Sequence, residues 1–425
     1  MSELSTKPDR VATRRKLLVY GLNYAPELTG IGKYSGEMVG QLFADGYEVQ
    51  VITAPPYYPD WQVFAGHSNW WSSLDVKSNG SLHVIRCPLW VPSKPTGLKR
   101  ILHLLSFALS SLPIVIAKAF WRPDVVVVVA PAFACAPGGW LAARLCGAKA
   151  VLHIQDFEVD AAFSLGLLKN TFLRRVVLAI EGFVLRRFDR VSTISNAMLN
   201  RLSDKGVAKD RQLLFPNWVD TSHVFPLDAE SPLRSMLGFT QADVIVLYSG
   251  NMGAKQGLDL LLDAALILVD RPDIKFILCG DGAERERLQA KYAGLGNVIW
   301  IPLQPLDELN NLLNAADIHA LPQLADAADL VMPSKLTGMM ASGRPTVASA
   351  SAGTEIHAVV SGRGLVVPPG DSSAFAEAIR TLADSPEKRH CLGQVSREYA
   401  IAHFARAAIL SRFERDLMDC IDEVR

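Results

Sequence analysis

The chain has 425 residues, 49% of them apolar, and its 43 basic and 43 acidic side chains give a formal net charge of zero. The length indicates two domains, and the balanced charge argues against nucleic-acid binding driven by overall charge. The six cysteines are scattered without a CxxC pair. Neither a zinc site nor a disulfide framework is therefore predicted, and a reducing cytoplasm is expected.

The first half begins with a βαβ pattern. Its polar amino terminus lacks the apolar run of a signal peptide. Lys16–Thr53 then reads as an apolar strand, a glycine-containing loop, an amphipathic helix and a second strand. Further strands are expected at Asp124–Pro131 and Ala148–Asp156. Continuous apolar strands separated by helices are typical of parallel sheets that are buried on both faces.

A glycine loop precedes the first helix. Gly30 and Gly32 could let the backbone cradle a donor phosphate or approach a substrate closely. The next glycine is Gly36, so the spacing is not that of a dinucleotide-binding GxGxxG loop, and the second strand ends in Thr and Pro rather than an acidic residue. Nicotinamide binding is therefore disfavoured.

Two segments of the first half could contact a membrane. Ile101–Ala117 is apolar but only 17 residues long, with a proline and several polar residues, so a buried or interfacial helix is expected rather than a span. Thr171–Arg190 reads as a basic amphipathic helix. Such a helix can lie on an anionic membrane surface, or it can be a domain helix with a solvated charged edge.

The run HIQD, from His153 to Asp156, ends a strand of the first half. A histidine or carboxylate at that place can orient a sugar hydroxyl or take a proton. His153 could equally be a core histidine with satisfied hydrogen bonds. Asp156 is the better placed of these two catalytic candidates, because ligands of open parallel sheets bind at the carboxyl ends of strands.

The second half repeats the βαβ plan over Val244–Gly280, and further strands are expected at Ala316–Pro322 and Arg344–Ser349. Two glycine turns follow its first strands. The predicted donor-binding residues of these turns are Gly250, Asn251, Lys255, Gly280 and Gly282. Glycines let the backbone approach a ligand, and Lys255 can reach a phosphate, although the second turn could also be an ordinary βα connection.

The run Pro333-Ser334-Lys335 stands at the start of a predicted helix over about Lys335–Ser342. Ser334 is the expected N-cap. Free backbone amides, the helix dipole and the Lys335 ammonium would together favour an anion there. An ordinary capped helix is the alternative. Combined with the glycine turns, the helix start predicts a diphosphate site.

We therefore predict two Rossmann-like domains, joined near Val224–Ser231, with the ligand in the cleft between their sheets. The expected ranges are 1–225 for the first domain and 226–385 for the second. Residues 386–425 are expected to form helices that pack across the junction.

Several segments in this order resemble retaining family 4 glycosyltransferases of the GT-B fold, over nearly the whole chain. They include LNYAPELTGIGKYSGEMVGQLFADG, SGNMGAKQGLDLLLDAA, FILCGDGAERERL and PSKLTGMMASGRPTVAS. The runs ITAPPYYPDW, HIQDFEVDAAFSLGLL and VMPSKLTGMMASGRP are similar to the WcaI-like glycosyltransferases of colanic-acid-type exopolysaccharide assembly.

This resemblance implies that residues 1–225 bind the acceptor and that residues 226–385 bind the nucleotide sugar, with donor contacts at Ser334, Lys335 and Leu336. The chain departs from the family pattern at four positions. An arginine and a lysine that often hold the diphosphate are replaced by Asn251 and Gln256. Family members also often carry two glutamates around this helix start. The first position falls near Leu330 and the second on Gly338, so both glutamates are missing here. Asp326 or Asp329 could substitute for them.

The implied reaction transfers a sugar, with retention, from GDP-fucose or a UDP-sugar to a lipid-diphosphate-linked saccharide. No metal or other cofactor is expected, because helix amides and lysines can stabilise the departing diphosphate. The implied location is the cytoplasm, peripherally at the inner face of the plasma membrane. A nucleotide-sugar 2-epimerase and a non-catalytic nucleotide-sugar-binding subunit are the alternative functions.

Overall fold

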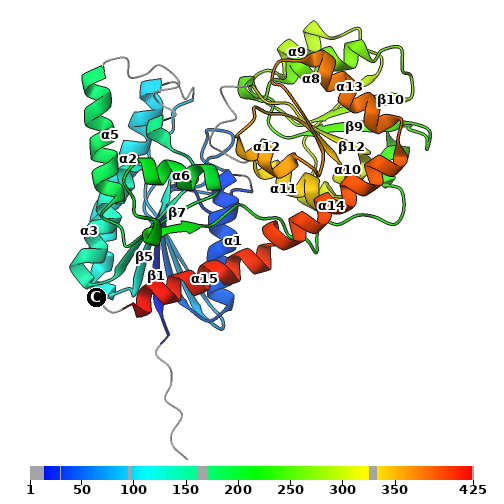
Figure 1. Cartoon of the computed structure of the whole chain (residues 1–425). Helices are drawn as coiled ribbons and strands as arrows, with labels where there is room; N and C mark the ends of the chain where they lie inside the picture. Colours follow the sequence, from blue (N-terminus) through cyan, green and yellow to red (C-terminus); the bar gives the residue numbers. More distant parts are fainter. Residues whose placement is uncertain are drawn as a thin grey trace, which may run out of the picture. The chain divides into compact units, whose positions relative to one another are not determined.

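The computed structural model describes residues 14–28, 30–93, 97–131, 133–160, 171–324 and 333–423. The chain forms two compact units, each built around one sheet (Figure 1). Unit 1 comprises Met1–Ser192, Leu202–Leu213 and Glu414–Arg425, and unit 2 comprises Thr193–Arg201 and Leu214–Phe413. The division before Leu214 falls earlier in the chain than the junction expected near Val224–Ser231.

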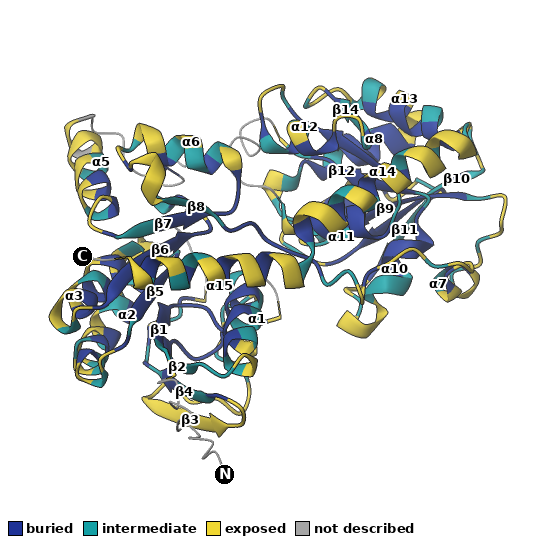
Figure 2. Cartoon of the chain, turned by 60° about the horizontal axis from the view of Figure 1, so that its bottom comes forward, coloured by how far each residue is buried: buried dark blue, intermediate teal, exposed yellow. Residues whose placement is uncertain are grey.

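Unit 1 contains an eight-stranded sheet with the order β3-β4-β2-β1-β5-β6-β7-β8. Its strands are β1 (Lys16–Gly21), β2 (Glu48–Thr53), β3 (Ser72–Lys77), β4 (Ser81–Arg86), β5 (Val125–Ala130), β6 (Lys149–Ile154), β7 (Arg190–Thr193) and β8 (Gln212–Leu214). The central strands pair in parallel, whereas β3 is antiparallel to β4. Figure 2 shows β3 exposed and the valine-rich β5 buried, as expected for an edge strand and a central strand.

The helices that follow these strands are α1 (Gly30–Ala44), α2 (Gly97–Lys118), α3 (Ala136–Cys146), α5 (Thr171–Leu185) and α6 (Asn196–Asp204). One face of α2 packs on the sheet: Phe107 lies 5.9 Å from the Tyr20 ring, and Ser111 Oγ lies 2.6 Å from the Tyr20 hydroxyl. The apolar run Ile101–Ala117 thus lies in a helix that is partly buried. Among the described residues, Gly97–Trp121 is long and apolar enough to cross a membrane by length and composition.

Unit 2 contains a six-stranded parallel sheet with the order β11-β10-β9-β12-β13-β14. The strands are β9 (Val244–Ser249), β10 (Ile274–Cys279), β11 (Val298–Ile301), β12 (Ile318–Leu321), β13 (Thr346–Ser349) and β14 (Leu365–Val367). The helices are α7 (Pro232–Met236), α8 (Leu258–Ile267), α9 (Arg285–Lys291), α10 (Leu309–Ala315), α11 (Ser334–Ala341), α12 (Glu355–Val360), α13 (Ser372–Ala383), α14 (Pro386–Phe404) and α15 (Arg406–Asp422).

Alternate residues of β9 belong to different hydrophobic cores. Val246 and Tyr248 lie in one cluster, and Ile245 and Leu247 lie in the other. Both faces of the sheet are therefore covered, which explains the continuous apolar character of its strands in the sequence. The two parallel-sheet units confirm the predicted fold class.

The carboxyl-terminal helix returns to unit 1. Glu414, on α15, accepts a hydrogen bond of 2.7 Å from the Tyr47 hydroxyl, and Asp422 forms an ion pair of 2.5 Å with Arg15. These contacts agree with the division of α15 between the units: α14 and the first half of α15, up to Phe413, belong to unit 2, whereas the rest of α15, from Glu414, belongs to unit 1.

Candidate substrate-binding sites

Two glycine turns interlock at the carboxyl edge of the unit 2 sheet. Gly250 follows β9, whereas Gly280 and Gly282 follow β10, and all three have positive φ. A Cβ added to Gly280 would lie 2.0 Å from the Gly250 carbonyl oxygen, and one added to Gly282 would lie 2.5 Å from the Met252 carbonyl oxygen. The Met252 amide donates to the Asp281 carbonyl at 2.7 Å. Glycine is therefore needed where these two backbones approach each other.

Lys335 lies beside the first of these turns. Its Nζ is 4.0 Å from the centroid of the Tyr248 ring and would be 3.5 Å from a Cβ on Gly250. The Nζ atom is buried and has no hydrogen-bond partner among the described residues. Burial lowers the pKa of this amine to about 7, because a charged group loses solvation in the protein interior. We call Lys335, Tyr248, Gly250, Gly280 and Gly282 the Lys335 site.

The helix start differs by one residue from the prediction. Ser334 is the first residue of α11, and Pro333 occupies the N-cap position without any side-chain cap. Ser334 therefore cannot cap α11, because its backbone is already helical and its carbonyl accepts from Thr337 Oγ1 at 2.8 Å. Leu336 is fully buried and its amide donates to the Pro333 carbonyl at 3.0 Å. The uncapped first turn leaves backbone amides available for an anion.

Of the other residues of unit 2 that the sequence singled out, two are exposed, one lies within α11 and three lie outside the described residues. Asn251 and Lys255 are both exposed. Gly338 lies within α11, whereas Asp326, Asp329 and Leu330 lie outside the described residues. Among the residues that the structure describes, no group of three or more His, Cys, Asp or Glu side chains could hold a metal ion.

Unit 1 contains a cavity of about 160 Å³ that brings together Gly30 and Asp156, two of the predicted residues. Gly30 begins α1, and Asp156 follows β6. The cavity is also lined by Asn23, Tyr57, Tyr58, Trp61, Arg100, His103 and Glu158. Asp156 thus has the position expected of a strand-end carboxylate in a ligand site, and its catalytic role stays a prediction.

A buried carboxylate holds one wall of this unit 1 cavity. Glu27 accepts from the amides of Tyr57 and Tyr58 at 3.0 and 3.1 Å, and from Asn23 Nδ2 at 2.9 Å. Burial raises the pKa of Glu27. A Cβ on Gly32 would lie 2.5 Å from its carboxylate. The glycine at position 32 is therefore explained by packing, and its predicted contact with donor phosphate stays a prediction.

His153 is a buried residue of β6. Its side chain is 2% exposed, Nδ1 lies 3.0 Å from Ser192 Oγ, and burial lowers its pKa to about 3. The imidazole is therefore neutral near pH 7. This environment favours the core-histidine alternative, and a catalytic role for His153 stays a prediction.

Sequence reasoning did not select Glu27, Arg100 or His103 as functional residues. Glu27 offered one signal, since it is the acidic residue in the loop between the first strand and Gly30. Arg100 and His103 lie on α2, whose apolar composition suggested contact with a membrane rather than a ligand site. Their position at the cavity depends on tertiary packing, which local sequence does not show.

Comparison with known proteins agrees with this two-unit architecture. Residues 29–218 match the family described as "Glycosyl transferase 4-like domain", and residues 243–385 match "Glycosyl transferases group 1". The chain is 44% identical over 413 residues to WcaI of Escherichia coli (strain K12), which is named as a colanic acid biosynthesis glycosyl transferase; this covers 95% of the chain and 99% of WcaI.

Solved structures of low sequence identity share the fold. Sucrose-phosphate synthase from Thermosynechococcus elongatus superposes with a TM-score of 0.74 at 19% identity, covering 96% of this chain and 99% of that one. Anabaena HepE in complex with UDP and glucose superposes with a TM-score of 0.68 at 15% identity, covering 96% and 100%. With these matches over both units, the chain belongs to the group 1 glycosyltransferases of the GT-B fold and is a homologue of WcaI.

Proposed function

We propose that this glycosyltransferase moves a sugar from a nucleotide-diphosphate donor to a lipid-diphosphate-linked saccharide in exopolysaccharide assembly. The observation that supports it best is the buried Nζ of Lys335, which has no hydrogen-bond partner among the described residues and lies beside the uncapped start of α11. A diphosphate would supply the negative charge that this amine lacks. The name of WcaI points to colanic-acid-type assembly, and the UDP and glucose bound to HepE support a nucleotide-sugar donor.

The donor is GDP-fucose or a UDP-sugar, and it binds to residues 226–385. We assign the diphosphate to Lys335 and the amides of the first turn of α11, next to the Gly250 turn. Exposed Lys255 and Asn251 contribute at the rim. Metal ions are unnecessary in this proposal, because an ammonium group and preorganised amides stabilise the charge that develops on the leaving group.

The proposed chemistry is a front-face displacement with retention. The bond between the sugar C1 and the diphosphate oxygen breaks as the acceptor oxygen bonds to C1 from the same face. The acceptor proton passes to the departing phosphate oxygen, so no protein nucleophile is needed. Residues 1–225 bind the acceptor, and Asp156, at the carboxyl end of β6, orients its hydroxyl.

Unit 1 also carries a surface that suits peripheral binding to the inner face of the plasma membrane. A stripe of leucines on α2 is exposed, at positions Leu98, Leu102, Leu105, Leu109 and Leu112. The neighbouring Lys99, Arg100, Lys118 and Arg122 add positive charge. On α5, Phe172, Ile180 and Phe183 are exposed beside Arg174 and Arg175. Apolar side chains with basic neighbours are typical of helices that bind anionic membranes.

The test incubates the purified protein with radiolabelled GDP-fucose or UDP-sugars and a bacterial lipid extract. Transfer of the label to lipid supports the proposal, and the anomeric configuration of the product, measured by NMR, checks retention. Conversion of the free nucleotide sugar would instead identify a 2-epimerase. Donor binding with neither reaction would identify a binding subunit and contradict the proposed transfer.

A further inference from the structure

We propose that the unit 1 cavity binds the saccharide of the acceptor, with His103 Nε2 accepting a hydrogen bond from a sugar hydroxyl. This inference rests on the proposed function, because it names the group that the acceptor-binding half recognises. It depends on three features of the cavity: a wall of packed rings, a buried nitrogen without a hydrogen-bond partner among the described residues, and a mixture of charged and polar side chains in the lining.

Three rings form the apolar wall. The ring centroids of Tyr57 and Trp61 are 5.6 Å apart, and those of Tyr57 and Trp61 lie 4.8 and 5.2 Å from that of His103. Trp61 has a positive φ of 52°, which is uncommon for a residue with a large side chain. Backbone strain of this kind clusters at active sites, ligand clamps and switch regions. The C–H faces of a pyranose pack against an aromatic wall of this kind, because both surfaces are apolar.

His103 is completely buried, and its two nitrogens differ. Nδ1 lies 2.6 Å from the Trp90 carbonyl oxygen, so Nδ1 carries the hydrogen and donates it. Nε2 is then an acceptor, and it is buried without a hydrogen-bond partner in the part of the chain that the structure describes. An unmet acceptor in the interior costs free energy. A ligand hydroxyl in the cavity would remove that cost.

Charged and polar side chains restrict the class of ligand. Asn23, Arg100, Asp156 and Glu158 line the same cavity as the rings. An apolar ligand would leave the acceptor on His103 unpaired, and an anion would lie close to two carboxyl side chains. A neutral sugar has an apolar face for the rings and hydroxyls that donate to His103, Asp156 and Glu158.

The helix that carries His103 also carries the exposed leucine stripe. His103, Leu104 and Arg100 line the cavity, whereas Leu98, Leu102, Leu105 and Leu109 are exposed. A lipid-linked saccharide has an apolar tail, an anionic diphosphate and a polar head. On α2 the tail would meet the exposed leucines, the diphosphate would meet Arg100, and the head would enter the cavity. One helix thus supplies contacts to all three parts of the acceptor.

The test measures binding of a short-chain alkyl diphosphate-linked hexose and of the same alkyl diphosphate without the hexose, by titration calorimetry. The variants are His103→Phe and Trp61→Leu, and the control is Trp71→Leu, an exposed tryptophan that does not line the cavity. We expect His103→Phe and Trp61→Leu each to bind the hexose probe about tenfold more weakly than the parent protein does, as for a lost hydrogen bond or ring contact. Binding of the sugar-free probe and of GDP or UDP should stay unchanged, as should all binding by Trp71→Leu.

Two results would overturn the inference. One is hexose binding that is unaffected in both cavity variants, and the other is an equal loss for the probes with and without sugar, which would show recognition of the diphosphate alone. Retained binding of the sugar-free probe, which meets Arg100 on α2, shows that unit 1 of each variant is folded, and retained GDP or UDP binding shows the same for unit 2. If the parent protein binds hexose in the cavity but transfers no sugar, the proposed function fails and the binding site stands. If transfer proceeds with the same acceptor KM in every variant, the binding site fails and the function stands.

Discussion

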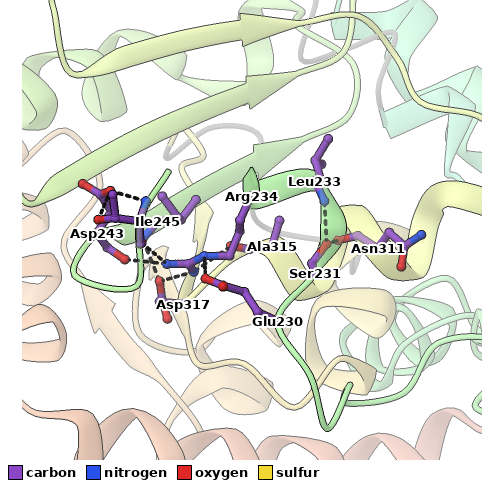
Figure 3. Close-up of polar contacts among 10 residues, drawn as sticks. Glu230, Ser231, Leu233, Arg234, Asp243, Ile245, Asn311, Ala315 and Asp317 are labelled. Carbon is purple, nitrogen blue, oxygen red and sulfur yellow. Dashed lines mark hydrogen bonds and ion pairs between the residues drawn. The ribbon is translucent and has the colours of Figure 1, made fainter. Parts of the chain in front are cut away.

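Arg234 and Lys335 are cations of the same unit that differ in their partners: only Arg234 is paired with carboxylates among the described residues, although its Nε, like Lys335 Nζ, makes no hydrogen bond. Arg234 donates to the Ala315 carbonyl at 3.2 Å, to Asp317 Oδ2 at 2.8 Å and to the Asp243 carbonyl at 2.6 Å, and it forms an ion pair of 2.8 Å with Glu230 (Figure 3). Lys335 Nζ contacts the Tyr248 ring but has no hydrogen-bond partner among the described residues. Internal partners offset the burial of the guanidinium group of Arg234, whereas no described residue does so for the Lys335 ammonium, and we assign that role to the donor diphosphate.

The positions of Arg234 and Lys335 relative to the sheet agree with the difference in their partners. Asp243 precedes β9 and Asp317 precedes β12, so Arg234 lies at the amino ends of the strands. Asp317 Oδ2 also accepts from the amide of Ile245, the second residue of β9 (Figure 3). The Lys335 site lies where β9 and β10 end. Ligands of open parallel sheets bind at the carboxyl ends of strands, so the amino-end cluster is assigned to stability and the carboxyl-end site to binding.

The largest expected effect comes from breaking the Arg234 cluster. Arg234→Met should lower the free energy of unfolding by about 3 kcal/mol, because it removes the charge partner of two carboxylates and leaves buried carbonyls without donors. Urea denaturation measures this loss. Nucleotide affinity of the folded variant should equal that of the parent.

A double-mutant cycle with Asp317→Asn provides the control for this prediction. The two substitutions should destabilise by less together than the sum of their separate effects, since both interrupt the same ion pair. Additive losses, or a loss of GDP and UDP affinity by folded Arg234→Met, would contradict the assignment of this cluster to stability alone.

The next effect should appear in binding rather than stability. Lys335→Met removes a buried amine that has no hydrogen-bond partner among the described residues, so stability should be unchanged or slightly raised. Affinity for the preferred nucleotide, GDP or UDP, should fall about 100-fold through the loss of a charge-assisted contact with the diphosphate. Calorimetric titration measures the affinity, and thermal unfolding measures the stability.

Lys255→Met is the matched lysine control. Lys255 is exposed in the turn after β9, and a screened surface charge contributes little, so its loss should weaken binding by less than about threefold. An equal loss of affinity in the two variants would remove the distinction between the buried and the exposed lysine. A large drop in stability for Lys335→Met would show that Lys335 supports the fold instead.

The same comparison shows what the sequence could predict. The βαβ pattern, the strands β5, β6, β12 and β13, and the fold class follow from apolar runs and glycine turns, and they are confirmed. Lys335 and the glycine turns could be selected because they stand next to strand ends and a helix start. The one-residue error at Ser334 arose because Pro333 satisfies the backbone requirement of an N-cap without a capping side chain.

Contacts between distant segments could not be predicted in the same way. Nothing local indicates that Lys335 lies over the Tyr248 ring or that Arg234 reaches Asp317. His103 was hidden in the apolar run of α2, and its meeting with Tyr57 and Trp61 depends on how α2 packs against the sheet. Periodicity predicts which face of an element is buried but not which polar atom on that face lacks a partner.

The smallest expected effect is a pH dependence that belongs to Lys335 alone. Burial lowers its pKa from the ordinary value of 10.5 to about 7 in the folded protein. Below pH 7 the amine is charged in both the folded and the unfolded protein, so the cost of burying the charge is fully present. As the pH rises from 7 toward 10.5, the folded protein holds a neutral amine while the unfolded chain still binds the proton, so stability increases.

Parent protein should therefore gain stability relative to Lys335→Met between pH 6 and pH 9, by about 2.5 kcal/mol. The comparison cancels the titration of all other groups, and urea denaturation at both pH values measures it. Nucleotide affinity should change in the opposite direction and weaken above pH 7 in the parent only, because the diphosphate binds the ammonium form and binding takes up a proton. A constant difference in stability across this pH range would mean that the amine keeps its proton in the folded protein, and the distinction from Arg234 would then rest on hydrogen bonding alone.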